Sequence, residues 1–272
     1  MSKVEVVVAT MNQEDDSLYK KMNIHSDVVI ANQAQADSFL EKVEDGFQIK
    51  MITTSGKGVG KNRNMGLAYA DSEILMLADD DIVYHDGYEQ MISRAFEELS
   101  EADVIIFRMQ FIKNGKVYEI DKHHTRRLHI WNGLSFGTYQ IAIKRKSLER
   151  ANIHFTHLFG GGCIYSAGED SIFLIDCFRK GLKVYSYAGL LGDNIRESSS
   201  WFKGYNRKFF FDRGALAAGG FSKFKYLMCL YYVIVYRKKT DIPNIEKLKL
   251  MIAGVKGYSN LITYEEWEKK RH

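Results

Sequence analysis

Short apolar runs alternate with stretches of helical periodicity along the first 200 residues, and this alternation restricts the fold more than any other feature. Four runs are rich in β-branched or aliphatic residues and read as buried strands: Val4–Ala9, Asp27–Ala31, Ile49–Thr53 and Glu73–Leu77. Strands that alternate with helices form a mostly parallel sheet with helices on its faces. We therefore expect an α/β fold whose ligand site lies at the carboxyl ends of the strands.

The middle of the chain departs from simple alternation. Asn114-Gly115 separates two apolar runs and predicts a β-hairpin, which we expect to add antiparallel strands to the sheet edge. A further strand is expected at Leu182–Tyr187. Helices are expected at residues 61–70, 87–99 and 171–180.

Composition places the chain among ordinary globular proteins. With 272 residues, of which 46% are hydrophobic and 26% charged, it can bury a sizeable core. Its three cysteines show no close pairing, which argues against a disulfide framework and fits a reducing cytoplasm. We find no signal-peptide pattern and no run of the roughly 18 apolar residues that a membrane span needs. A cytoplasmic location is expected, with the inner face of the cell membrane as an alternative.

Charge is distributed unevenly. Residues 201–272 hold 15 basic and 6 acidic residues, a net charge of +9, and the total of +4 leaves −5 for residues 1–200. We expect a sheet-containing domain over 1–200 and a basic, mainly helical extension over 201–272. Such an extension fits an anionic partner, although plain solvation of helix faces explains the lysines equally well. Nucleic acid is not expected, because no recognised binding module accompanies the charge.

The segment Phe221–Tyr236 is rich in aromatic residues and lies between basic clusters. It is too short and too rich in tyrosine to cross a bilayer. Two interpretations stay open. The segment is either a helix that lies on an anionic membrane surface, or a helix buried in the fold or in a contact between subunits of a homo-oligomer.

Asp79, Asp80 and Asp81 directly follow the apolar run Ile74–Ala78, which places three carboxylates at the end of a buried strand. Adjacent like charges repel, and burying them costs free energy unless a cation neutralises them. Mg²⁺ and Mn²⁺ favour a few carboxylates together with phosphate oxygens. The triplet therefore predicts a metal site that can bridge a pyrophosphate, and a solvated acidic turn is the simpler alternative.

Two weaker signals accompany the triplet. The glycine-rich turn Gly56–Gly60 precedes a predicted helix whose N-terminal amides could hold an anion, though such a segment is more often only a turn. Glu169 and Asp170 open another predicted helix, where a carboxylate can be an ordinary cap. Combined with the metal interpretation, Asp170 becomes a candidate general base.

Together these segments resemble the family 2 glycosyltransferases of the GT-A fold. The resemblance rests on Thr10 after the first strand, Gly60–Ala68 with Arg63-Asn64-Met65-Gly66, Leu77–Asp81 and Gly168–Asp170. It is closest to bacterial enzymes that build capsular polysaccharide or exopolysaccharide. It implies a Rossmann-like GT-A sheet. The implied activity is transfer of a sugar, with inversion, from a nucleotide-diphosphate donor, usually a UDP-sugar, to a hydroxyl of a glycan or lipid-linked acceptor.

The resemblance also implies roles for single residues. The residues expected to bind the donor are Thr10, Asn12, Arg63, Asp79 and Asp80. The expected ligands of Mn²⁺ or Mg²⁺ are Asp81 and Asp79, and the expected catalytic residues are Asp170, as general base, and Glu169. Arg196 and Trp201 are expected to contact the acceptor or a phosphate.

The sequence departs from the family pattern in several respects, among them the motif of the first strand. Asn32 and Gln33 stand where the second strand of the family often ends in an acid, and the QxxRW motif of processive synthases is absent, which favours one sugar per event. Two other functions stay open. A nucleotidyltransferase would carry a basic, glycine-rich loop where this chain has the acidic segment Thr10–Asp15. A non-catalytic protein of the same fold would bind a nucleotide sugar without transferring it.

Overall fold

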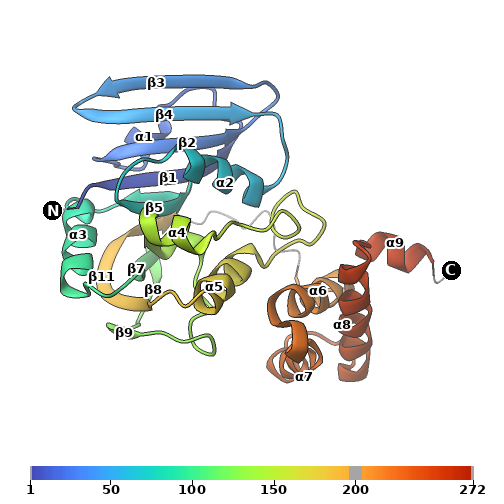
Figure 1. The fold of residues 1–272 in the computed structure, drawn as a ribbon. Coiled ribbons are helices and arrows are strands. Elements are labelled where there is room, and N and C mark those ends of the chain that lie inside the picture. The colour runs from blue at the N-terminus through green and yellow to red at the C-terminus, as the bar shows by residue number, and fades with distance from the viewer. Residues whose placement is uncertain (1, 196–203, 271–272) are drawn as a thin grey trace.

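The computed structural model describes residues 2–195 and 204–270, and Figure 1 shows a twisted sheet flanked by helices, with further helices beside it. The strands are β1 (Val4–Met11), β2 (Asp27–Gln33), β3 (Ser38–Glu44), β4 (Phe47–Thr54), β5 (Ile74–Asp79), β6 (Ile82–Tyr84), β7 (Val104–Lys113), β8 (Lys116–Ile120), β9 (Arg126–Arg127), β10 (Ile141–Lys144) and β11 (Val184–Ile195). The helices are α1 (Leu18–Lys21), α2 (Val59–Tyr69), α3 (Tyr88–Glu98), α4 (Arg145–Ala151), α5 (Glu169–Arg179), α6 (Arg207–Phe221), α7 (Lys225–Val235), α8 (Asn244–Ser259) and α9 (Tyr264–Lys269).

The sheet has the strand order β3-β4-β2-β1-β5-β10-β7-β11-β6. Its centre, β4-β2-β1-β5, is parallel, and β7 is parallel to β11. The expected fold class, a GT-A-like mixed sheet flanked by helices with a helical C-terminal extension, is confirmed. Ala9 pairs with Asp79 in the parallel register of β1 and β5, so the ends of these strands meet at one edge as expected.

Both faces of the sheet are covered, which explains why the strands are continuously apolar. Val6 and Val8 of β1 belong to the core on one face, and Val7 belongs to the core on the other. Successive side chains of a strand point to opposite faces, so a strand buried on both sides needs no polar alternation.

Antiparallel strands flank the parallel centre on both sides. The predicted hairpin forms, with Asn114 at φ 51° and Gly115 at φ 68° between β7 and β8. Of the two hairpin strands, β8 lies off the main sheet path, whereas β7 lies within it, between β10 and β11. We did not predict β10, which runs antiparallel between β5 and β7, or the edge strand β3.

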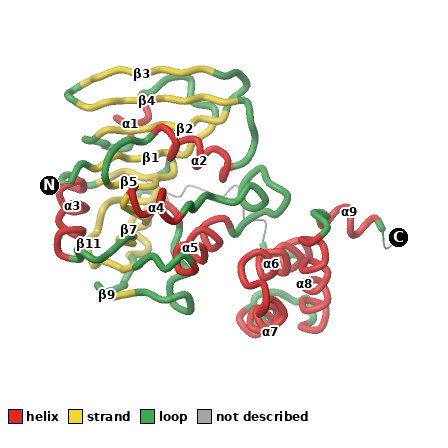
Figure 2. Tube along the Cα trace, in the orientation of Figure 1, coloured by secondary structure: helices red, strands yellow, loops and turns green. Residues whose placement is uncertain are grey.

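The C-terminal helices lie beside the sheet (Figures 1 and 2) and share an apolar core with Phe159, Tyr165 and Ile172. Helices α6 and α8 cross closely, because a Cβ added at Gly214 would lie 1.9 Å from the carbonyl oxygen of Met251. Within the described ranges, no helix is long and apolar enough to cross a membrane. The expected boundary between residues 200 and 201 lies outside the described residues, so the division into two domains stays a prediction.

Candidate active site

A pocket of about 830 Å³ opens where the carboxyl ends of β1 and β5 meet the N-terminus of α5. Asp79, the last residue of β5, lies at this edge with Asp80 and Asp81. Glu169 and Asp170, the first residues of α5, line the same pocket. The two acidic segments that the sequence separates by almost 90 positions therefore face one space.

Thr10 and its neighbours fix the end of β1. The hydroxyl of Thr10 donates to Oδ2 of Asp80 at 2.6 Å, and Nε2 of Gln13 donates to Oγ1 of Thr10 at 3.1 Å. Asn12 adopts φ 56°, and its backbone N–H donates to the backbone carbonyl of Gln33 at 2.9 Å. Thr10 and Gln33 line the pocket, and the turn at Asn12 joins the ends of β1 and β2.

Buried amides attach helix α2 to the sheet. Nδ2 of Asn62 donates to the carbonyl oxygens of Thr10 at 3.0 Å and Ala31 at 2.7 Å. Nδ2 of Asn32 donates to the carbonyl of Gln13 at 2.9 Å and to Oγ1 of Thr53 at 3.1 Å. Asn32, a residue at the family's acidic position, is thus a buried link between the segment after β1 and strand β4.

Arg63 connects the two acidic segments. From one turn inside α2, its guanidinium donates to Oδ1 of Asp79 at 2.7 Å, and to Oε1 of Glu169 and Oδ1 of Asp170 at 3.2 Å each. Its side chain is 6% exposed and lies over the ring of Phe155. Burial alone would lower the pKa of the guanidinium, but the three carboxylates outweigh it and raise that pKa. Arg63 is a fixed cation shared by three acids.

Asp170 has the electrostatics of a base that works near neutral pH. About a third of its side chain (32%) faces the pocket. The surrounding protein, and then the negative charge of Glu169, raise the pKa of its carboxyl to about 7, against the opposing effect of Arg63. The Thr138 hydroxyl donates a hydrogen bond to Oδ1 of Asp170. Sequence reasoning missed Thr138, because nothing in the sequence links the segment 138–140 to α5.

The pocket suits a cation in charge and donor type. The described lining residues include more acids than bases. The five acids are Asp79, Asp80, Asp81, Glu169 and Asp170, and the two bases are Lys21 and Arg63. No group of three or more His, Cys, Asp or Glu side chains within residues 2–195 and 204–270 is arranged to hold a metal. Mg²⁺ and Mn²⁺ bind through one or two carboxylates and take their other ligands from substrate phosphates and water, and carboxylates of this kind line the pocket.

The family model of glycosyl transferase family 2 matches residues 8–166, more than half of the chain. The chain belongs to glycosyl transferase family 2. The matched range includes Thr10, Arg63 and the aspartate triplet, and it stops just before Glu169 and Asp170. The chain is therefore a glycosyltransferase by family.

Solved structures of Staphylococcus aureus TarS share the fold of this family 2 chain. TarS residues 1–349 give a TM-score of 0.59 at 13% identity, covering 96% of this chain and 93% of TarS 1–349. The same TarS fragment in complex with UDP-GlcNAc gives 0.57 at 16% identity, covering 97% of this chain and 77% of that one. Its complex with UDP gives 0.54 at 16% identity, with 98% and 78% covered. No curated protein matches the sequence significantly.

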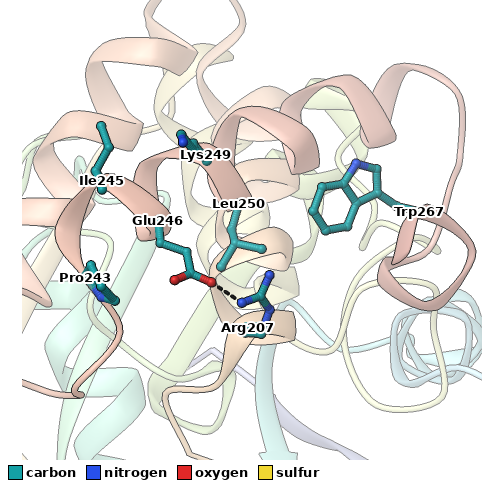
Figure 3. A pocket seen from close by; sticks show the side chains of 7 residues that line it. All are labelled: Arg207, Pro243, Ile245, Glu246, Lys249, Leu250 and Trp267. Atoms are coloured by element: carbon teal, nitrogen blue, oxygen red, sulfur yellow. Dashed lines mark hydrogen bonds and ion pairs between the residues drawn. The ribbon is translucent and has the colours of Figure 1, made fainter. Parts of the chain in front are cut away.

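A second pocket, of about 410 Å³, lies among the C-terminal helices of this glycosyltransferase (Figure 3). Arg207 and Glu246 form an ion pair in it, and Trp267 forms one wall. Its one acid is already paired with a base, so we assign the chemistry to the larger pocket. Arg196 and Trp201 lie outside the described residues, and their expected contacts stay predictions.

Proposed function

We propose that this glycosyltransferase transfers one sugar, with inversion, from a UDP-sugar to an acceptor hydroxyl in bacterial cell-surface polysaccharide synthesis. The observation that carries the proposal is the Arg63 ion-pair cluster, which places Asp79 at the strand end and Asp170 at the helix start on the same wall of the pocket. An inverting displacement requires an acid on the donor side of the pocket and a second carboxylate that can take the proton of the acceptor hydroxyl.

Asp170 acts as the general base. The acceptor oxygen forms a bond to the anomeric carbon while the bond from that carbon to the diphosphate breaks, and the hydroxyl proton moves to the carboxylate of Asp170. Attack opposite to the leaving group inverts the anomeric centre. A carboxyl with a pKa of about 7 is strong enough as a base to accept this proton at neutral pH.

The donor side carries charge that needs a counter-ion. Five acids against two bases repel a pyrophosphate, so we propose that Asp81, with Asp79, holds Mn²⁺ or Mg²⁺. When bound, such an ion offsets the negative charge that develops on the diphosphate leaving group. Thr10, which is bonded to Asp80, and the adjoining turn at Asn12 are proposed to contact the nucleoside. Uridine is favoured because the fold-related TarS fragment was solved with UDP-GlcNAc and with UDP.

A nucleotide-sugar screen tests the proposal. Thermal shift with UDP-sugars is measured with Mn²⁺ and with a chelator, because a ligand that binds the folded state raises the melting temperature. We expect one UDP-sugar to stabilise the wild type only with the metal. Asp81→Asn should lose that shift, whereas Asp86→Asn, an exposed acid on the other side of β6, should keep it. A shift unaffected by the chelator would contradict the metal site.

The product distinguishes the alternatives. A transferase releases UDP from the stabilising donor when an acceptor is present, and slowly releases free sugar from water attack without one. Formation of a nucleotide sugar from a sugar phosphate and UTP would instead identify a nucleotidyltransferase. Binding with neither reaction would identify a non-catalytic protein.

A further inference from the structure

One face of helix α7 is apolar and exposed along its whole length. The α7 face consists of Tyr226, Leu227, Leu230, Tyr231, Ile234 and Val235. Leu227 is 61% exposed and Ile234 60%, whereas Cys229 on the opposite side of the helix is fully buried. At about 100° per residue, the six positions fall within about half of the helix circumference. Helix α7 therefore packs against α6 and α8 with one half and presents a continuous apolar stripe with the other.

Basic residues surround this stripe. Lys223 precedes α7, Arg237, Lys238 and Lys239 follow it, and all four are exposed. The sequence contains no Asp or Glu from residue 213 to residue 240. Of the acids on the neighbouring helices, Asp212 is paired with Lys208 and Glu246 with Arg207, and only exposed Asp241 lies just beyond the basic run. The rim of the α7 face is thus strongly positive.

We propose that the α7 face docks on the surface of an anionic lipid bilayer. An amphipathic helix with an apolar stripe and a basic rim binds such a surface through buried apolar area and through attraction to anionic head groups. Tyrosines, which Tyr226 and Tyr231 contribute to the stripe, favour the boundary between head groups and hydrocarbon. With 11 residues, α7 spans about 16 Å at 1.5 Å per residue, about half of the hydrocarbon core, so it lies along the surface.

A second copy of the chain fits the same face less well. A twofold contact would place the α7 faces against each other, and each would bring its basic rim towards the other's. Helix α7 also lies at the lower end of the C-terminal helices in Figure 1, and its exposed half is open to a flat surface. Peripheral docking does not depend on the identity of the sugar donor, and it would bring a lipid-linked acceptor to the enzyme.

Vesicle sedimentation with the full chain tests the proposal. The probes are vesicles of phosphatidylcholine alone and of phosphatidylcholine mixed with phosphatidylglycerol. We expect binding to the mixed vesicles, weakened by added salt, and little binding to phosphatidylcholine alone. Lys238→Gln with Lys239→Gln should weaken binding about 25-fold, because each basic residue near the surface contributes about a fivefold factor. Lys249→Gln with Lys256→Gln, exposed on α8, is the matched control and should bind nearly as the wild type does.

The apolar stripe is tested separately. Leu227→Ser with Ile234→Ser should lower vesicle binding at least tenfold, because two side chains lose their apolar burial. Val43→Ser, at an exposed site on β3, should change nothing. Hydrolysis of the donor without vesicles should stay at the wild-type rate in every variant, which separates failed docking from failed catalysis. Equal binding to both vesicle types would overturn the proposal. A second set of results would also overturn it: light scattering shows a dimer, the Leu227 and Ile234 changes abolish that dimer, and the protein does not bind vesicles.

Discussion

At the scale of single residues, the site depends on how one guanidinium is shared. Arg63 contacts Asp79, Glu169 and Asp170, and these acids come from two elements that are distant in sequence. Three carboxylates close together repel one another, so their proximity requires the buried cation. Because one positive charge cannot fully offset three negative ones, the pKa of Asp170 stays raised.

Activity should therefore depend on pH through Asp170. The base works only when deprotonated, so kcat/KM should fall about tenfold per pH unit below about 7. Asp170→Asn should lower kcat by about 10²–10⁴-fold and retain donor binding. Asp176→Asn, on the same helix, is the control and should keep activity. A wild-type profile that is flat from pH 5 to 8 (about the range in which such a carboxyl titrates) would contradict the role of Asp170.

The same raised pKa affects stability with a definite sign. The folded-state pKa of Asp170 exceeds the ordinary value near 4, so the folded state binds the proton more tightly. Its contribution to stability is present at low pH and is lost as the pH rises through about 7. The difference in melting temperature between Asp170→Asn and the wild type should therefore shift in favour of the variant as the pH rises from about 4 to about 7.

Removing the shared cation should destabilise the protein. Arg63→Met leaves three carboxylates without their shared cation in a largely buried place, and should lower the free energy of unfolding by about 3–5 kcal/mol. Arg94→Met, which removes an exposed pair with Glu98, should cost less than about 1 kcal/mol. Urea denaturation measures both. Equal midpoints for the two variants would mean that the Arg63 cluster does not stabilise the fold.

At the scale of elements, close backbone approach decides how the C-terminal helices pack. Gly214 on α6 faces the carbonyl of Met251 on α8, and Gly254 on α8 faces the carbonyl of Phe211 on α6. A Cβ at either position would lie 1.9 Å from the facing oxygen, so the two helices can cross here only because neither residue has a side chain. The apolar core among α6, α7 and α8 forms around this crossing.

Alanine substitutions on α6 should separate packing from helix propensity. Gly214→Ala forces α6 and α8 apart and should lower stability by about 1–3 kcal/mol. Gly219→Ala on the same helix meets only the ring of Tyr258, which can move, so the change should be neutral or should gain up to about 1 kcal/mol from propensity. Thermal unfolding compares the two. Equal stability of both variants would argue against a close crossing.

At the scale of the whole molecule, the C-terminal helices hold the loop that precedes the proposed base. Asp212 on α6 accepts hydrogen bonds from the amide of Ser166 at 3.0 Å and from its hydroxyl at 2.6 Å. A Cβ at Gly168, next to Glu169, would meet Leu216 of α6 at 2.7 Å. The basic extension is thus attached to the catalytic wall of the pocket, whatever surface its outer helix contacts.

Breaking that attachment should slow turnover. Asp212→Ala leaves both donors of Ser166 without this acceptor and should lower kcat by about tenfold to a hundredfold, because small misplacements of a reacting group are costly. Lys208→Met keeps the Ser166 bonds and removes only the ion pair with Asp212, so its effect should be smaller. Steady-state kinetics at saturating donor measures both. An unchanged kcat in Asp212→Ala would show that α6 does not position the loop.

Much of the sheet was predictable because its signals are local. The four strands of the parallel centre were expected within a few residues of their ends, and Asn114-Gly115 identified its hairpin. Asp45-Gly46, with φ 54° and 85°, carries the same hairpin signal, which we overlooked together with β3. Strand β10 has only four residues and runs antiparallel to both of its neighbours, β5 and β7. Its position in the sheet depends on these distant partners, which no local sequence pattern specifies.

The sequence alone determined the strands of the parallel centre, the family, and the residue types of the pocket, because apolar periodicity, turn residues and strand-end acids are properties of neighbouring positions. Only the tertiary structure decided that Arg63 lies among three acids, that Thr138 contacts Asp170, and that α7 turns an apolar half outward. These facts depend on contacts between distant segments. Packing sets such contacts, and they in turn determine which charges are shared, which pKa values shift and which surfaces stay exposed.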